Sequence, residues 1–89
     1  MKAVLTVIGK DRVGIIAAIS TILAENNVNI RDISQTIMGD MFTMIMLVDI
    51  TQNRMDFSAL TGKLDQKGQE LGVSVRIQHE DIFNSMHRI

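Results

Sequence analysis

The spacing of the apolar residues changes from strand-like to helical and back along the chain, and this order most constrains its fold. Residues 3–8 are almost wholly apolar and rich in β-branched side chains, as expected of a strand covered on both faces. Residues 13–26 follow with apolar side chains at the spacing of a helix. These side chains are Ile15, Ile19, Ile22 and Leu23. The chain is therefore predicted to begin with a strand and a helix.

Polar residues are placed to end this helix on both sides. Asp11 can accept a hydrogen bond from a free backbone N–H group and is predicted to cap the amino end. Asn26 and Asn27 suit the carboxyl end, because Asn tolerates the left-handed conformation that terminates helices.

A second strand is predicted next, with an irregularity in its middle. In residues 28–38 the apolar residues occupy even positions first and odd positions later. A regular strand cannot place both sets on one face, so a bulge or break is predicted near Arg31 and Asp32. Gly39 and Asp40 are a two-residue hairpin signal, in which Gly supplies a positive φ.

The rest of the chain predicts a third strand, a second helix and a fourth strand. Residues 41–50 alternate, and the set predicted to point inward is Phe42, Met44, Met46, Val48 and Ile50. Asp56 is a suitable cap for the second helix, and Gly72 is a suitable stop. The apolar stripe of this helix is Phe57, Leu60, Leu64 and Leu71, and Gly68 would allow close approach to the sheet. Residues 73–80 alternate again, with Val73, Val75 and Ile77 inward.

This order of elements is the split βαβ arrangement of ferredoxin-like folds. The expected fold class is α+β, with a four-stranded antiparallel sheet and both helices on one face. The first and third strands are the most apolar and should be central, with the second and fourth at the edges. The other face would expose an apolar patch, made of Val4 or Leu5 with Ile45 and Leu47. Self-association or the C-terminal tail would cover it, and we expect a homodimer.

The length of the chain predicts one small domain. Residues 1–80 would form this domain, and residues 81–89 would form a C-terminal tail. The apolar residues of the tail recur at helical spacing, which favours a short helix packed on the domain or on a partner. These residues are Ile82, Phe83, Met86 and Ile89.

Composition excludes several classes of function. The formal net charge of −1 provides no overall field that would attract nucleic acid or an anionic membrane. The absence of cysteine excludes disulfides and thiol nucleophiles. The first residues lack the pattern of a signal peptide, and the uncharged stretch 13–24 is too short to span a bilayer. We therefore expect a soluble protein, most simply a cytoplasmic one.

A short charged loop lies where the first strand becomes the first helix. It reads GKDRVG, residues 9–14. A loop that opens a helix offers unpaired backbone N–H groups and the positive end of the helix dipole, which suit a carboxylate. Gly14 has no side chain, so a ligand or the neighbouring backbone can approach it closely.

Residues 9–30, GKDRVGIIAAISTILAENNVNI, resemble the start of an ACT domain, the small regulatory module that senses amino acids. The shared features are the loop D-R-x-G-I, a helix with L-A-E near its end, and V-N-I at the next strand. The resemblance continues through DISQT and MIMLVDI and covers residues 2–80. The chain also looks like the small stand-alone ACT proteins of bacteria and archaea.

The resemblance implies a non-catalytic regulatory domain that binds an amino acid or a similar small metabolite between two copies. It would signal to a partner, either an enzyme or a transcription factor of amino-acid metabolism. In this chain Asp11 would face the ammonium group of the ligand, and Asn29 would bind it from across the interface. The implied ligand-binding residues are Lys10, Asp11, Arg12, Val13, Gly14, Ile15 and Asn29. No catalytic residue, cofactor or metal is implied.

Other interpretations remain open from the sequence. Asp11 could serve only as a cap, Gly14 only for close packing, and Arg12 as a solvated side chain or dimer-rim contact. The whole chain could be a structural or protein-interaction domain without ligand. An enzyme of acylphosphatase type would use an Arg in a comparable loop, but the glycine-rich anion-binding loop of those enzymes is missing here.

Nucleic-acid and metal binding are disfavoured by the side chains present. RNA-recognition modules of this topology stack bases on aromatic residues of the central strands, where this chain has only Phe42, which alternates with the core set. His79 and His87 lack a third ligand nearby and are interpreted as surface residues. The methionines of the hairpin are interpreted as packing residues; they are Met38, Met41, Met44 and Met46.

Overall fold

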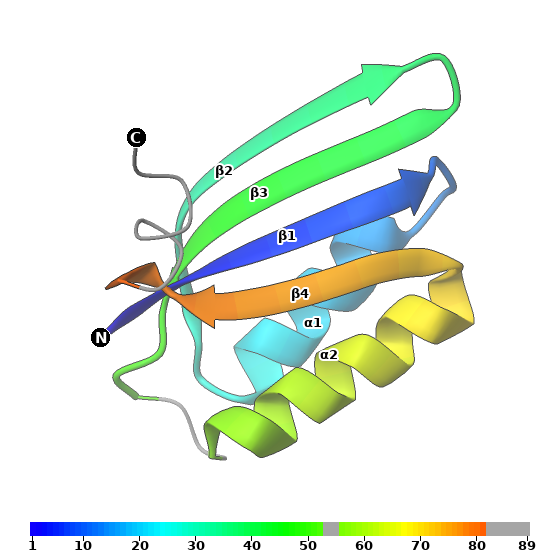
Figure 1. The fold of residues 1–89 in the computed structure, drawn as a ribbon. Coiled ribbons are helices and arrows are strands. Elements are labelled where there is room, and N and C mark those ends of the chain that lie inside the picture. Colours follow the sequence, from blue (N-terminus) through cyan, green and yellow to red (C-terminus); the bar gives the residue numbers. More distant parts are fainter. Residues whose placement is uncertain (53–55, 82–89) are drawn as a thin grey trace.

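The computed structural model describes residues 1–52 and 56–81 and has the predicted order of elements (Figure 1). The elements are β1 (Lys2–Lys10), α1 (Ile15–Glu25), β2 (Asn29–Met38), β3 (Met41–Asp49), α2 (Phe57–Leu71) and β4 (Val73–His79). A short helix is predicted for the tail, residues 81–89, of which residues 82–89 lie outside the described residues.

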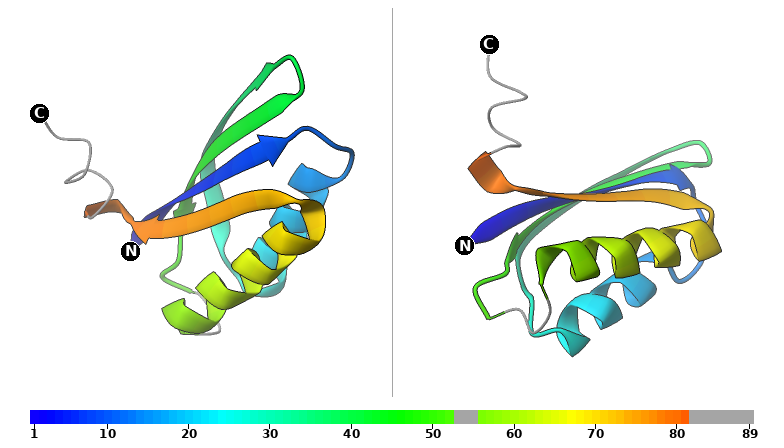
Figure 2. Two further views of the ribbon diagram at one scale, coloured as in Figure 1. Left: turned by 45° about the vertical axis from the view of Figure 1, so that its right-hand side comes forward. Right: turned by 60° about the horizontal axis from the view of Figure 1, so that its bottom comes forward.

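The four strands form one antiparallel sheet in the order β2-β3-β1-β4. Strands β1 and β3 are therefore central and β2 and β4 are the edges, as predicted. Helices α1 and α2 pack on the same face of the sheet, and neither lies on the opposite face (Figure 2). This confirms the α+β, ferredoxin-like class.

The core lies between the sheet and the helices. In β1 the odd-numbered side chains point to the helices, so Leu5 is fully buried while Val4 lies on the other face. In β3 the inward set is the one predicted from alternation, and Met44 and Met46 are completely buried. The helices contribute Ile15, Ile19, Ile22, Leu23, Leu60 and Leu64.

Turns and helix ends follow local chemistry at most positions. Asp56 caps α2 by accepting a hydrogen bond from the Ala59 N–H at 2.7 Å. Gly72 ends α2 with φ of 75°, and Asn27 takes φ of 59° after α1. Gly68 lies against β4, where an added Cβ would be 2.8 Å from the carbonyl oxygen of Val73. These four predictions are confirmed.

Strand β2 has the predicted bulge, and the bulge decides which side chains face the helices. The pairing register shifts between Ile30 and Asp32. Beyond this point Ile33 and Ile37 pair with Met46 and Phe42 and so lie on the helix side of the sheet. The helices lie beneath β1 and β4, whereas the β2–β3 hairpin projects beyond them (Figure 1). Ile33 and Ile37 are consequently 44% and 51% exposed.

Candidate functional site

The loop between β1 and α1 starts the helix differently from the prediction. Asp11 is not the cap: the N-cap position is Gly14, with φ of 95° and ψ of 0°. The helix begins only at Ile15, so the side chain of Asp11 lies too far back along the chain to cap the first turn. Glycine readily adopts the left-handed conformation at this position, because it has no Cβ to clash.

The first turn of α1 consequently keeps free amide donors. No side chain of the described residues caps it, and no acidic residue lies in the turn. The first helical hydrogen bond runs from the Ala18 N–H to the Gly14 carbonyl at 2.9 Å. The N–H groups of Ile15, Ile16 and Ala17 precede it and lie at the positive end of the helix dipole.

The residues that carry these amides line a cleft of about 240 Å³. One wall is the loop with the first turn of α1, and the other is the helix side of the β2–β3 hairpin. The cleft is lined by Asp11, Arg12, Gly14, Ile15, Ile16, Ala17, Gln35, Ile37 and Phe42. Pockets for drug-sized ligands measure about 300 to 1,000 Å³, so this cleft suits a single small metabolite.

Two hydrogen bonds hold the loop in place. The Asp11 N–H donates to the carbonyl oxygen of Asp40, in the hairpin turn, at 2.6 Å. The Arg12 Nη1 donates to the carbonyl oxygen of Leu71, at the end of α2, at 3.0 Å. Arg12 therefore has a positioning role in addition to lining the cleft, and the Asp11 carboxylate is left free of any capping bond.

The structure brings together only part of the predicted site. Asp11, Arg12, Gly14 and Ile15 line the cleft. Lys10 pairs with Met41 on the face away from the helices, and Val13 is 99% exposed. Neither residue lines the cleft of its own chain.

Asn29 lies at the far end of β2, opposite Asp49. Along the strand it is about 20 Å from Gln35, at roughly 3.3 Å per residue. Asn29 thus does not reach the cleft of its own chain.

The sequence prediction missed the wall formed by the hairpin. Gln35 and Ile37 face the helix side, opposite Met44 and Phe42. The signal was present in the sequence: the bulge and the two-residue turn together fix this register and place both side chains beside α1. Ile16 and Ala17 were missed because the helix starts later than predicted.

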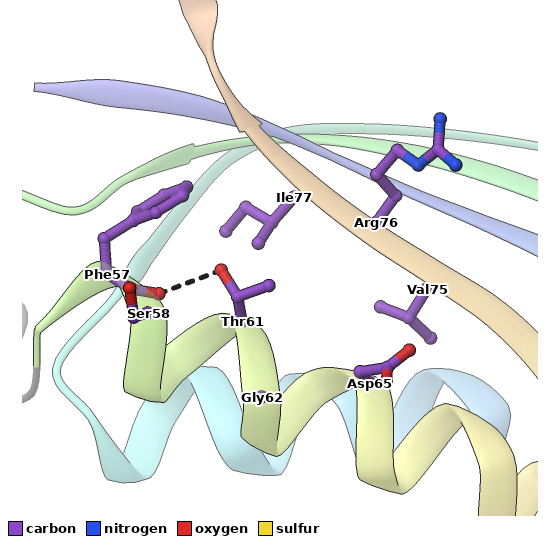
Figure 3. A pocket seen from close by; sticks show the side chains of 8 residues that line it. All are labelled: Phe57, Ser58, Thr61, Gly62, Asp65, Val75, Arg76 and Ile77. Atoms are coloured by element: carbon purple, nitrogen blue, oxygen red, sulfur yellow. Dashed lines mark hydrogen bonds between the residues drawn. The ribbon is translucent and has the colours of Figure 1, made fainter.

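A second, larger hollow of about 540 Å³ lies between α2 and the edge strand β4 (Figure 3). Its walls include Phe57, Thr61 and Val75, and the Thr61 hydroxyl donates to the Phe57 carbonyl at 2.8 Å. Arg76 points away from α2, whereas Asp65 lies on α2 itself (Figure 3). Because its charged groups do not converge, this hollow is a weaker ligand site than the cleft beside Asp11.

The described residues contain no group of three His, Cys, Asp or Glu side chains able to hold a metal ion. None of the helices in this part of the chain has the length and apolar content of a membrane span.

The profile of the ACT domain family matches residues 2–78. This chain belongs to the ACT domain family. This ACT domain is 60% identical over 88 residues to a UPF0237 protein of Methanocaldococcus jannaschii, covering 99% of the chain and 98% of that protein. Among solved structures it is similar to an ACT domain protein from Streptococcus pneumoniae, with a TM-score of 0.81, 43% identity and 93% coverage of both chains.

The fold of this ACT domain also occurs in regulatory proteins. The regulatory subunit of aspartate kinase from Thermus thermophilus, in its ligand-free form, superposes with a TM-score of 0.65 at 23% identity. The match covers 86% of this chain and 50% of that subunit. The resemblance seen in the loop and helix motifs is thus confirmed for the family, and the fold is shared with this regulatory subunit.

Proposed function

We propose that this ACT domain is a non-catalytic regulatory module that binds an amino acid or a similar small metabolite. In this proposal it passes the bound state to a partner, an enzyme or a transcription factor of amino-acid metabolism. The observation that carries the proposal is that hydrogen-bond donors and an anionic acceptor belong to residues of one small cleft. The uncapped amides of α1 are donors, and the free carboxylate of Asp11 is an acceptor.

The chemistry of the cleft matches the groups that all α-amino acids share. The carboxylate of the ligand would accept hydrogen bonds from the first-turn N–H groups, which the helix dipole strengthens. The ammonium group would donate to Asp11 in a charge-assisted hydrogen bond. The side chain of the ligand would then lie against Ile37 and Phe42, which favours an apolar or small one.

A second copy of the chain would complete the site. The β2 edge pairs only with β3 in the described chain, and Ile33 and Ile37 beside it are exposed. Antiparallel pairing of two β2 edges about a two-fold axis near Ile33 makes the same contacts twice. This arrangement would bring the Asn29 end of β2 in the second copy beside the Ile37 end in the first. Because Asn29 pairs with Asp49, its side chain lies on the face away from the helices and away from the cleft.

Ligand screening tests the proposal directly. The melting temperature of the full chain would be measured with each amino acid, and binding of the best would be quantified by equilibrium dialysis. A ligand at one hundred times its dissociation constant should stabilise the fold by about 2.7 kcal/mol. Asp11→Asn should weaken binding, whereas Asp65→Asn, a matched change on the exposed face of α2, should not. If no amino acid changes the melting temperature, the chain is a structural or interaction domain instead.

A further inference from the structure

Helices α1 and α2 both lie on one side of the sheet (Figure 2), and the opposite face carries apolar side chains. They come from the central strands, where Val4 pairs with Leu47 and Thr6 pairs with Ile45. Ile45 is 42% exposed and Ile8, further along β1, is 45% exposed. An apolar patch on a sheet face is a surface that favours a cover.

Burial on this open face is uneven. Val4 is only 7% exposed, and Leu47 is half-buried. Both lie toward the end of the sheet where β1 starts and β4 finishes. The exposed Ile8 lies toward the opposite end. The Val4 end of this face is therefore better shielded than the Ile8 end, although neither α1 nor α2 lies over it.

The chain leaves β4 at this same end. After His79, Glu80 and Asp81 adopt helical conformation, and they border a hollow shared with Met1 and Lys2. This last described turn lies on the side of the sheet away from the helices (Figure 2, right). The chain is thus directed toward the open face at the point where residues 82–89 begin.

The sequence of this C-terminal segment has one apolar and one polar side when placed on a helix. Ile82, Phe83, Met86 and Ile89 form the apolar side, and Asn84, Ser85, His87 and Arg88 form the polar side. As a helix these residues span about 12 Å, and the step from β4 over β1 to β3 is about 10 Å. The segment is long enough to reach Leu47. It is too short to continue to Ile8, roughly 13 Å further along β1 from Val4.

We propose that residues 82–89 form a helix that packs its apolar side on Val4 and Leu47 of the same chain. The point where the chain leaves β4 and the reach of the segment favour this occupant. The open face carries both signs of charge, with Lys2, Lys10 and Arg76 beside Asp32 and Asp49, and the polar side of the docked segment would face solvent above them.

Paired cysteines test the contact, because the natural chain has none. The full chain carrying Leu47→Cys and Met86→Cys should form an intramolecular disulfide under mild oxidation. The control carrying Ile8→Cys and Met86→Cys has the same tail cysteine but an open-face partner out of reach, and it should stay largely reduced. Products would be separated by non-reducing electrophoresis and mass spectrometry. Equal oxidation of both pairs, no disulfide in either, or a disulfide only between two chains would each overturn the proposal.

A second measurement avoids changes in the sheet. Phe83→Ser with Met86→Ser in the full chain should uncover the patch and increase the fluorescence of a hydrophobic dye. Asn84→Ser with His87→Ser changes the polar side of the same segment and should leave the dye signal unchanged. Circular dichroism checks that all chains are folded. Equal dye signals from the two folded variants would contradict the docking.

Discussion

Gly14 determines where α1 starts and which amides stay free. Its φ of 95° is in the left-handed region, and nothing lies within 4 Å of the position that a Cβ would occupy. Gly14→Ala should therefore cost about 1 to 2 kcal/mol of stability through backbone conformation alone. Denaturant unfolding measures this cost.

Gly62 supplies the matched control for that prediction. It also has open space around a hypothetical Cβ, but it lies within α2 at an ordinary helical φ. Gly62→Ala should stabilise the protein by about 0.5 to 1 kcal/mol, because alanine has the higher helix propensity. Similar effects of the two substitutions would contradict the role given to the left-handed conformation.

Asp49 makes stability depend on acid pH. Its carboxylate accepts hydrogen bonds from the Thr51 hydroxyl at 2.6 Å and the Thr51 N–H at 2.9 Å. These bonds, with the N-terminal ammonium 3.6 Å away, lower the pKa of Asp49 from 3.8 to about 2. Because this pKa is lower in the folded state than in the unfolded state, the ionised carboxylate stabilises the fold at pH values above the unfolded-state pKa. This contribution is lost as pH falls from about 4 toward 2.

Urea unfolding between pH 6 and pH 2 (the range chosen to span both values) tests this contribution. Asp49→Asn should be less stable than the natural chain at neutral pH, and its stability should fall less between pH 4 and pH 2. Thr51→Val removes the hydroxyl, which donates to Asp49 and accepts from the N-terminal ammonium, but it keeps the Thr51 N–H bond and should give an intermediate profile. Parallel pH profiles for the natural chain and Asp49→Asn would exclude Asp49 as a source of the acid sensitivity.

At the scale of elements, two aspartates that look alike in the sequence have different roles. Asp56 immediately precedes α2 and caps it, so Asp56→Ala should cost about 1 kcal/mol. Asp11 precedes α1 by several residues and caps nothing, so Asp11→Ala should change stability by less than about 0.5 kcal/mol. Thermal unfolding of both variants compares them directly. A larger loss for Asp11→Ala would show that the loop depends on its carboxylate.

The same comparison shows what the sequence could predict. Alternation placed Met44 and Met46 in the core, and the change of parity in β2 located the bulge, because a buried face admits only one register. The start of α1 could not be predicted as well. A glycine in left-handed conformation at an N-cap leaves no side-chain signal, so the polar residue upstream appeared to be the cap.

The site was harder to predict than the fold, because its walls come from segments far apart in the chain. The loop was found from its charge and its place before a helix. Gln35 and Ile37 required the register of the hairpin and the position of α1 beside it. Asn29 does not line this cleft, and the role that the resemblance implies for it would need a second copy, which no pattern within one chain specifies.

At the scale of the whole molecule, the projecting hairpin predicts how two chains associate. Ile33→Lys with Ile37→Lys places charges beside the β2 edge and should convert a dimer into a monomer. Ile8→Lys changes a similarly exposed residue at the far end of the open face and should leave the dimer intact. Sedimentation velocity distinguishes these states. A natural chain that sediments as a monomer, or dimers retained with both lysines, would rule out pairing through β2.

The loop beside the cleft is tied both to the turn at Asp40 and to the Leu71 carbonyl at the end of α2. A ligand that shifts this loop by even a fraction of a bond length must strain or relax both anchors together. The tip of the hairpin, where Met38 is 75% exposed, would then report occupancy to whatever protein reads it. The loop between β1 and α1 would then both contact the ligand and move the hairpin tip, and no rearrangement of the core would be needed.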